Sequence, residues 1–218
     1  MTTWRHSASF GSKTKACFQN SVVSGAGQSR RQRGRIAVQY GMPKDELLDK
    51  AIRRVPDFPR PGILFYDITS VLTQPEAFRH CICRMLDIYA DAHFDAVAAV
   101  ESRGFLFAAP FARERGLPLV LVRKKGKLPG DVYRCAYSLE YGTAEIEVHK
   151  ADVQDGASYL LVDDLIATGG TLAAARKLLA MGGGTVSDVF GVIGLPALRY
   201  EDALRPATVT TLITFDGA

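Results

Sequence analysis

The segment Tyr159–Thr171, which reads YLLVDDLIATGGT, combines acids, glycines and hydroxyl groups in an order that suits anion binding. Its apolar start is long enough for one buried strand, and the adjacent acids Asp163 and Asp164 end that strand. A helix is expected to begin within Ala167, Thr168, Gly169, Gly170 and Thr171. The unpaired N–H groups and the dipole of a helix start attract an anion, glycines allow close approach, and threonines add donors. The segment therefore predicts a phosphate site.

The two acids indicate what lies beside the phosphate. Because carboxylates repel phosphate, Asp163 and Asp164 require a group between the negative charges. Ribose hydroxyls and Mg²⁺ both fit, since carboxylates accept hydrogen bonds and are hard oxygen ligands. We therefore expect a site that holds a 5′-phosphate at one end and ribose hydroxyls at the other. The alternative is an ordinary loop whose acids cap the helix.

Two further charged segments follow expected strands. Glu101–Gly104 comes after the apolar Ala96–Val100, and Arg123–Gly130 comes after Leu119–Val122. In a parallel sheet the loops after the strands share one ligand crevice, so both segments are expected beside the two acids. Arg103 would bind an anion bidentately, and the cations of the second loop would meet a polyphosphate. The alternatives are a surface arginine that caps the next helix and a solvated loop.

The segment after the basic loop, up to His149, predicts a β-ribbon. Its residues Ala144–Val148 alternate apolar and charged side chains, which is typical of a strand with one exposed face. A positively charged ribbon over the site would form a lid that excludes water during a reaction.

The elements that position these residues follow from apolar periodicity. Helices are expected over Pro43–Arg54, from Pro75 onward and over Gly170–Met181, and further strands over Val186–Ile193 and Val209–Phe215. The short apolar run Ile63–Ile68 favours, by itself, an edge strand that covers the core. Strands and helices alternate with short connections, which predicts an α/β fold: a mostly parallel central sheet with helices on both faces.

Length and composition limit the architecture. At 218 residues and 47% apolar content, the chain can bury one substantial core, so one domain with a tail is expected. No apolar run is long enough to span a bilayer, and we expect a soluble chain with no membrane partner. The four cysteines lack zinc-type spacing and are expected to be reduced thiols.

Residues 1–41 differ from the rest in charge. They contain seven Lys or Arg and no Asp or Glu. From Met42 onward the chain therefore has the other 20 of the 27 basic residues and all 23 acidic ones, a net charge of −3. That remainder offers no basic field, and no nucleic-acid partner is expected. Residues 1–41 are either a mitochondrial or plastid transit peptide, a basic disordered tail, or an extension upstream of a natural start at Met42. The last two hypotheses predict a cytoplasmic protein.

Taken together, these segments resemble the adenine phosphoribosyltransferase family of the type I phosphoribosyltransferases. The matching segments run in family order: Asp57–Ile63 with Phe65, Asp67 and Ile68; Ser102–Phe107; Arg123–Gly130; Tyr137–Gly142; and Val162–Asp164 with Ala167–Thr171. The last of these marks the superfamily, whereas the proline-rich segment and the SLEYG sequence point to the adenine branch. The resemblance implies a phosphoribosyltransferase domain over 42–218, with a small N-terminal hood at 56–70 and a flexible β-ribbon lid at 123–149.

The resemblance implies purine salvage: adenine and phosphoribosyl pyrophosphate (PRPP) give AMP and pyrophosphate, with Mg²⁺ held by PRPP near Asp163 and Asp164 rather than by a side-chain cage. The implied PRPP- and AMP-binding residues are Ser102, Arg123, Asp163, Asp164, Ala167, Thr168, Gly169, Gly170 and Thr171. Arg103 and Lys127 would neutralise the pyrophosphate, and Glu140 on the lid would interact with adenine N7. A cis bond at Glu101–Ser102 and a homodimer are also implied.

For the base, the resemblance implies contacts with Leu64, Phe65 and Tyr66, which replaces the edge-strand hypothesis for that segment. The family commonly has arginine where this chain has Tyr66. If that position contacts the base only through its backbone, little changes, whereas a role for the side chain would alter base affinity. Two alternatives stay open: a phosphoribosyltransferase for another purine base, and a non-catalytic PRPP-binding regulator. The regulator would not need Arg103, Lys127 and Glu140 together.

Overall fold

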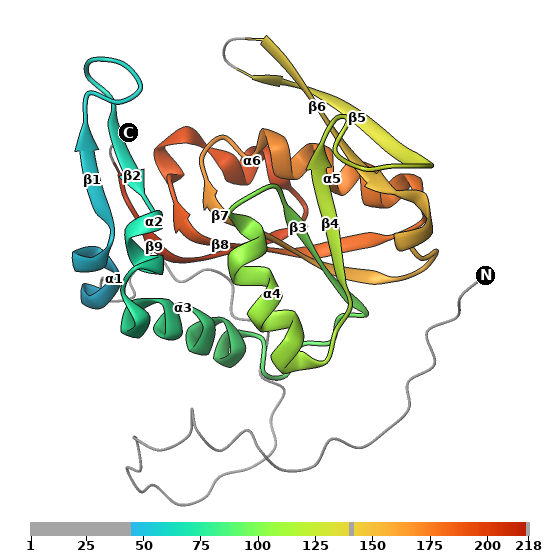
Figure 1. Ribbon diagram of the computed structural model, residues 1–218, viewed down its shortest axis with the longest axis horizontal. Coiled ribbons are helices and arrows are strands. Elements are labelled where there is room, and N and C mark those ends of the chain that lie inside the picture. Colours follow the sequence, from blue (N-terminus) through green and yellow to red (C-terminus); the bar gives the residue numbers. More distant parts are fainter. Residues whose placement is uncertain (1–44, 140–141, 217–218) are drawn as a thin grey trace, which may run out of the picture. The chain divides into compact units, whose positions relative to one another are not determined.

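The computed structural model describes residues 45–139 and 142–216 (Figure 1). The tail 1–41 and the predicted lid residue Glu140 therefore lie outside the described residues. Within those two ranges, no helix is both long and apolar enough to cross a membrane. Of the cysteines in the described part, Cys81 and Cys135 are free thiols.

The described residues form a seven-stranded central sheet in the order β5-β6-β4-β3-β7-β8-β9. Its parallel strands are β3 (Ala96–Val100), β4 (Leu119–Lys124), β7 (Ser158–Ile166), β8 (Thr185–Gly194) and β9 (Thr208–Thr214). The pair β5 (Val132–Leu139) and β6 (Gly142–His149) is antiparallel and joins the sheet at β4. The prediction of a mostly parallel sheet is confirmed.

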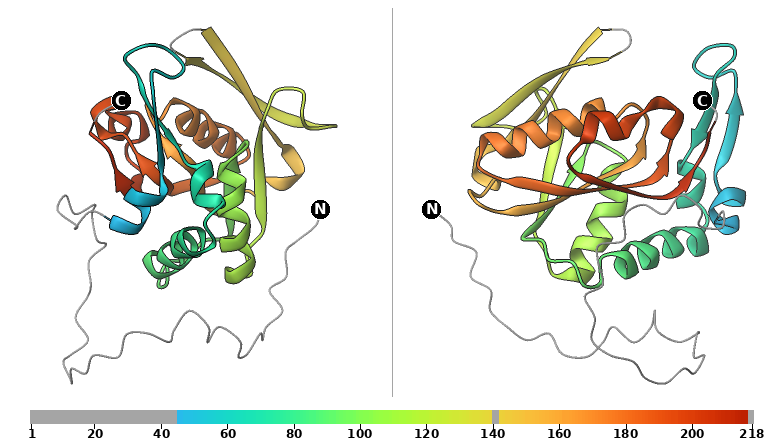
Figure 2. Two further views of the ribbon diagram at one scale, coloured as in Figure 1. Left: turned by 60° about the vertical axis from the view of Figure 1, so that its left-hand side comes forward. Right: turned by 180° about the vertical axis from the view of Figure 1, so that it is seen from behind.

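Helices cover both faces of the sheet, as predicted (Figure 2). One face carries α3 (Pro75–Ile88) and α4 (Gly104–Arg115), and the opposite face carries α5 (Gly170–Met181) and α6 (Tyr200–Leu204). The remaining helices are α1 (Glu46–Ala51), α2 (Thr69–Leu72) and two short 3₁₀ turns, Lys150–Asp152 and Pro196–Leu198. The sequence analysis missed α2 and α6, because four or five residues are too few to establish a helical period.

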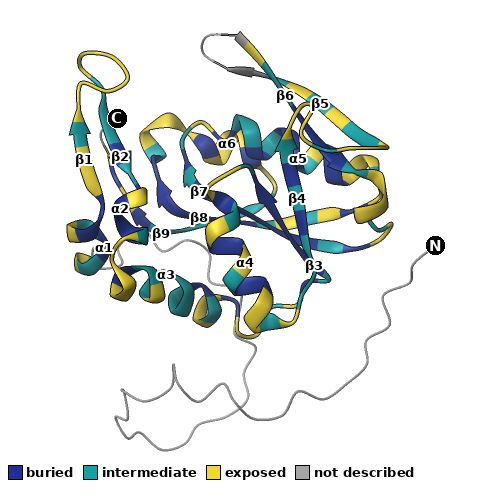
Figure 3. Cartoon of the chain, viewed as in Figure 1, coloured by how far each residue is buried: buried dark blue, intermediate teal, exposed yellow. Residues whose placement is uncertain are grey.

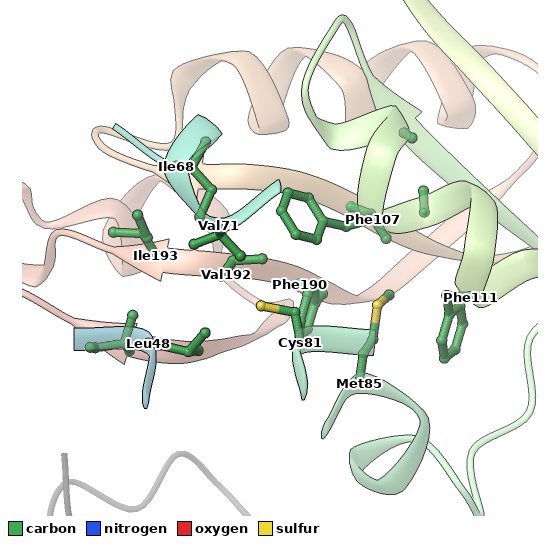
Figure 4. Packing of buried hydrophobic residues seen from close by; sticks show 14 of the residues in the cluster. Leu48, Ile68, Val71, Cys81, Met85, Phe107, Phe111, Phe190, Val192 and Ile193 are labelled. Carbon is green, nitrogen blue, oxygen red and sulfur yellow. The ribbon is translucent and has the colours of Figure 1, made fainter. Parts of the chain in front are cut away.

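The sheet separates two hydrophobic clusters because side chains alternate between the faces of a strand. Along β3, Val97 and Ala99 face the α3–α4 side, whereas Ala98 and Val100 face the α5 side. Every residue of β3 is buried, as Figure 3 shows for the centre of the sheet. On the α3–α4 side the cluster is built from long side chains of both helices and β8, among them Cys81, Met85, Phe107, Phe111 and Phe190 (Figure 4).

A separate antiparallel hairpin precedes the sheet, formed by β1 (Arg53–Pro56) and β2 (Leu64–Asp67). The helix expected to run to Arg54 instead ends at Ala51, and Arg53 and Arg54 belong to β1. Pro56 ends an edge strand, where proline is tolerated since its missing N–H faces no partner.

The buried side chain of Tyr66 anchors this hairpin to the end of β9. Its ring stacks on Phe215 with centroids 4.1 Å apart and planes 5° from parallel. Arg54, the cross-strand partner of Tyr66, places its guanidinium carbon 5.1 Å from the centre of the same Phe215 ring. An aromatic stack and a cation–π contact therefore hold both strands of the hairpin on one residue.

The β5–β6 ribbon departs from the predicted alternation at its base. Glu147, expected on an exposed face, is fully buried, and Ile146 and Val148 beside it are buried as well. The reason is tertiary: β6 pairs with β4 at this point and the basic loop after β4 folds over Glu147, whose carboxylate accepts two backbone N–H groups of that loop.

We predict that Phe215→Ala destabilises the protein by about 3–5 kcal/mol, because it removes a buried ring and the stack that holds the hairpin. Urea unfolding measures the change as a lower midpoint. Phe215→Leu is the matched control, since it keeps most of the apolar volume and loses the stack and the cation–π contact, at about 1–2 kcal/mol. Equal midpoints for the wild type and the alanine variant would contradict this anchoring role.

Candidate functional site

The two acids of the predicted phosphate segment lie within β7 rather than after it. The strand continues to Ile166 because β8 runs beside it: Asp163 pairs with Gly191, and Ile166 pairs with Gly194. The expected end of the strand before Asp163 is therefore wrong. The acids nonetheless occupy its carboxyl-terminal half, close to the sheet edge where ligands bind in parallel sheets.

The helix after β7 begins at Gly170, within the predicted segment. Gly169 precedes it in a left-handed conformation (φ 77°), which favours glycine. A side chain there would also meet the carbonyl oxygen of Tyr200 at 3.1 Å. No side chain among the described residues caps this helix start, so its first N–H groups and dipole can serve an anion.

Arg103 lies beside these acids, as predicted. Its Nε donates to Asp164 Oδ2 at 2.5 Å, and the Asp164 side chain is only 5% exposed. Partial burial disfavours the charged guanidinium, but the hydrogen bond and charge of Asp164 raise the pKa of Arg103 above its ordinary value. Among the described residues, the two terminal nitrogens of Arg103 form no hydrogen bond, so they can bind an anion while Nε holds Asp164.

A glycine sets this geometry. Gly104 begins α4 directly after Arg103, and a β-carbon there would lie 2.9 Å from the carbonyl oxygen of Val162 and 3.1 Å from Cα of Asp163. Such contacts are too short for any larger residue without movement of the backbone. The helix can therefore approach β7 closely enough for Arg103 to reach Asp164.

Asp163 is the electrostatically strained member of the pair. Loss of solvent at this position and the negative charge of Asp164 raise its pKa well above the ordinary value, although Arg103 acts in the opposite direction. The Asp164 N–H donates to Asp163 Oδ1 at 2.9 Å. Burial and the adjacent negative charge thus oppose the ionisation of Asp163, and Arg103 partly offsets them.

The loop that joins β3 to α4 also supports the basic loop after β4. The Glu101–Ser102 peptide bond is cis, as the resemblance implied. Glu101 accepts from the Lys124 N–H at 2.9 Å and pairs with Arg123 Nε at 3.3 Å. Burial opposes its ionisation, but these donors lower the pKa of Glu101. The loops with Ser102 and Arg123 thus meet, as expected for neighbouring parallel strands.

Within the basic loop, the cations have different surroundings. Arg123 is tied to Glu101 and donates to the carbonyl oxygen of Lys127 at 3.2 Å, and Lys125 pairs with Glu145 at 2.5 Å. The exposed Lys127 ammonium forms no ion pair within the described part of the chain. Lys127 and Lys124, which is also exposed and forms no ion pair with a described residue, are therefore the cations of this group that can turn to a bound anion.

The predicted base-binding residues lie on β2. Leu64 and Phe65 are half-buried, and the ring of Phe65 meets Phe58 edge-on at 5.1 Å. Tyr66 points to the opposite side of the strand, onto Phe215, so at this position the backbone alone is directed toward the face of Phe65. Asp67 links the hairpin to the site: hydrogen bonds from Thr69 chiefly lower its pKa, and the charge of Arg103 contributes.

The sequence analysis assigned no role to Glu101 or Glu147, which support the basic loop from two neighbouring strands. Glu101 directly follows the expected strand Ala96–Val100, and this position could have indicated a supporting role. Glu147 gave no comparable signal, because an alternating strand does not reveal which acid is buried.

Comparisons with known proteins agree with this geometry. A family model described as phosphoribosyl transferase domain matches residues 67–192. An adenine phosphoribosyltransferase from Treponema denticola is 58% identical over 183 residues, 84% of this chain and 96% of the relative. The crystal structure of the adenine phosphoribosyltransferase from Thermoanaerobacter pseudethanolicus is 42% identical with a TM-score of 0.75, over 78% of this chain and 99% of that one. The Saccharomyces cerevisiae adenine phosphoribosyltransferase, complexed with an imino-altritol bisphosphate and adenine, is 34% identical with a TM-score of 0.72, over 77% and 97% of the two chains.

We predict that Asp163→Asn stabilises the ligand-free protein at neutral pH. A carboxyl group whose pKa is raised by folding contributes stability below its unfolded value of about 3.9 and loses it as the pH rises through the folded value. The amide of the variant does not titrate, so the variant avoids this loss. Its free energy of unfolding should therefore exceed that of the wild type increasingly from pH 4 toward pH 8, by about 1.4 kcal/mol for each tenfold gain in proton affinity on folding.

Urea unfolding across this pH range measures the advantage, with the exposed Asp152→Asn as the matched control. An advantage that is constant with pH, or equal in the control, would contradict the raised pKa of Asp163.

Proposed function

The chain belongs to the adenine phosphoribosyltransferase family, and we propose that it transfers the 5-phosphoribosyl group of PRPP to adenine, with release of AMP and pyrophosphate, in purine salvage. The observation that carries this proposal is the contact of Arg103 with Asp164 at the end of β7, next to the uncapped start of α5. This arrangement offers ribose-binding acids between a phosphate-binding helix start and a cation.

Within the proposed site, the start of α5 binds the 5′-phosphate. Backbone N–H groups after Gly169 and the hydroxyls of Thr168 and Thr171 donate to its oxygens. Asp163 and Asp164 accept from the ribose hydroxyls. Arg103 holds Asp164 through Nε and the pyrophosphate through its terminal nitrogens, so the ribose and the leaving group are oriented against each other.

Reaction breaks the bond between ribose C1 and the pyrophosphate oxygen, which keeps the electron pair. Negative charge then grows on pyrophosphate, where Arg103 and Lys127 stabilise it as fixed charges. The new bond forms between the lone pair of adenine N9 and C1, and the imidazole proton of the base leaves from N7. Glu140, which follows β5 in the sequence, interacts with adenine N7 and accepts this proton.

The hairpin β1–β2 serves as the hood over adenine. Phe65 stacks on the base, and the backbone around Leu64 reads its Watson–Crick edge. Because the side chain of Tyr66 is occupied by Phe215, the exchange of the family's usual arginine leaves the base face of the hairpin unaltered. The ribbon β5–β6 serves as the lid of the site, and residues 42–218 form the catalytic domain.

Magnesium fits this site as an ion carried by the substrate. No group of three or more ligating side chains occurs among the described residues, so the chain offers at most Asp163 and Asp164 beside the oxygens of PRPP and water. When bound, the ion neutralises negative charge on the pyrophosphate.

Turnover of purine bases tests this proposal. We expect the full chain, with Mg²⁺ and PRPP, to release pyrophosphate with adenine and not with hypoxanthine, guanine or xanthine. Glu140→Ala should lower kcat by about 10²-fold or more, the usual size of a lost acid–base contribution, whereas Glu145→Ala on the same ribbon should retain activity. Turnover with another base would identify a phosphoribosyltransferase of different base specificity. PRPP binding without turnover would favour a non-catalytic regulator.

We also propose a cytoplasmic homodimer, in keeping with the family. Light scattering should therefore give about twice the chain mass of 23.7 kDa. A monomer mass under assay conditions would defeat the dimer without affecting the proposed reaction.

A further inference from the structure

Glu147 is a fully buried carboxylate in a strand that leads to the lid, and all of its contacts point to the basic loop and the ribbon. Oε1 accepts from the backbone N–H groups of Lys127 and Leu128, both at 2.9 Å. Oε2 pairs with Arg134 Nε at 3.3 Å. Although burial opposes ionisation, the donors from Leu128, Arg134 and Lys127 lower the pKa of Glu147, so it is charged near neutral pH.

The strand register explains how one side chain reaches both segments. Glu147 on β6 lies opposite Arg123 on β4 and opposite Arg134 on β5. Cross-strand partners project from the same face of a sheet, so the three side chains form a row across the base of the ribbon. This row connects the lid strands to the strand that carries the basic loop.

The same row fixes the backbone of Lys127 from two sides. Its N–H donates to Glu147, and its carbonyl oxygen accepts from Arg123 Nη1 at 3.2 Å. Arg123 is held in turn by Glu101. A residue whose backbone N–H and carbonyl oxygen are both bonded to ion-paired side chains has little backbone freedom. The Cα position of Lys127 is therefore fixed, although its ammonium is exposed.

We propose that Glu147 is a positioning residue of the transfer reaction, which places Lys127 at the pyrophosphate end of the site and couples that position to the β5–β6 ribbon. This inference rests on the proposed function, because it assigns Lys127 to the pyrophosphate. Glu147 does not touch the substrate; it acts through the loop backbone.

The proposal predicts a selective defect. Glu147→Ala removes the carboxylate acceptor of two loop N–H groups and leaves the Lys127 N–H only its 3.2 Å bond to the Lys124 carbonyl oxygen. Lys127 is then less firmly placed, so kcat/KM for PRPP and, in the reverse direction, for pyrophosphate should fall by about 10²-fold. The KM for adenine should stay unchanged, because the base contacts the hairpin. Glu147→Gln keeps an oxygen for both N–H groups but loses the charge facing Arg134, so its defect should be clearly smaller.

Glu145→Ala is the matched control. Glu145 is two residues away on the same strand and also contacts the loop, through the Lys125 side chain at 2.5 Å. It supports no backbone group of Lys127 with its side chain, so its loss should change kcat/KM for PRPP by less than about threefold.

A double-mutant cycle with Lys127→Ala separates positioning from general stability. If Glu147 acts through Lys127, then Glu147→Ala should add little in the Lys127→Ala background. Additive losses, or an equal loss for adenine and PRPP, would overturn the proposal. If Glu147→Ala does not fold, the same cycle is run with Glu147→Gln, and additivity there has the same meaning.

Calorimetric binding of PRPP distinguishes failure of this inference from failure of the proposed function. Weaker PRPP binding in the Glu147 variants, with no turnover of any base by the wild type, would retain the positioning role and reject the transferase. Unchanged PRPP affinity and unchanged kcat/KM in an active enzyme would reject the positioning role alone.

Discussion

The close approach of α4 to β7 at Gly104 is the constraint on which the site depends. A β-carbon at this position would collide with the backbone of Val162 and Asp163. Only because this space is empty can the preceding residue, Arg103, reach Asp164 from a neighbouring strand. A parallel sheet supplies the frame, since it brings the ends of β3, β4 and β7 to one edge.

The buried carboxylates of this site form ion pairs with arginines. Asp164 is matched by Arg103, Glu101 by Arg123, and Glu147 by Arg134. Each of these carboxylates is poorly exposed, and a buried charge is tolerated only when it is paired and hydrogen-bonded. Asp163 is the exception, and its raised pKa is the electrostatic consequence. The pairs leave the terminal nitrogens of Arg103 and the ammonium of Lys127 to meet an anionic substrate.

The two parts that would enclose a substrate are attached in different ways. The β1–β2 hairpin is held by aromatic contacts of Tyr66 and Arg54 with Phe215, near the carboxyl end of the chain. The β5–β6 ribbon is held by hydrogen-bonded ion pairs at Glu147. Ring stacking and a cation–π contact hold the hairpin through side chains, whereas hydrogen bonds set the loop backbone at defined atoms. The base end and the pyrophosphate end of the site are therefore controlled separately.

The sequence by itself determined the alternating elements, the start of α5 near Gly170 and the placement of Arg103, Asp163 and Asp164 toward one edge of the sheet, because apolar period, glycines and adjacent charges are local signals. It did not determine that β7 continues through the acids, that Arg54 begins a strand, that Tyr66 faces Phe215 or that Glu147 is buried. These features depend on residues far apart in the chain: β8 extends β7, Phe215 receives the hairpin, and the Lys127 loop covers Glu147. Local patterns carry no information on such partners, so only the tertiary structure decided them.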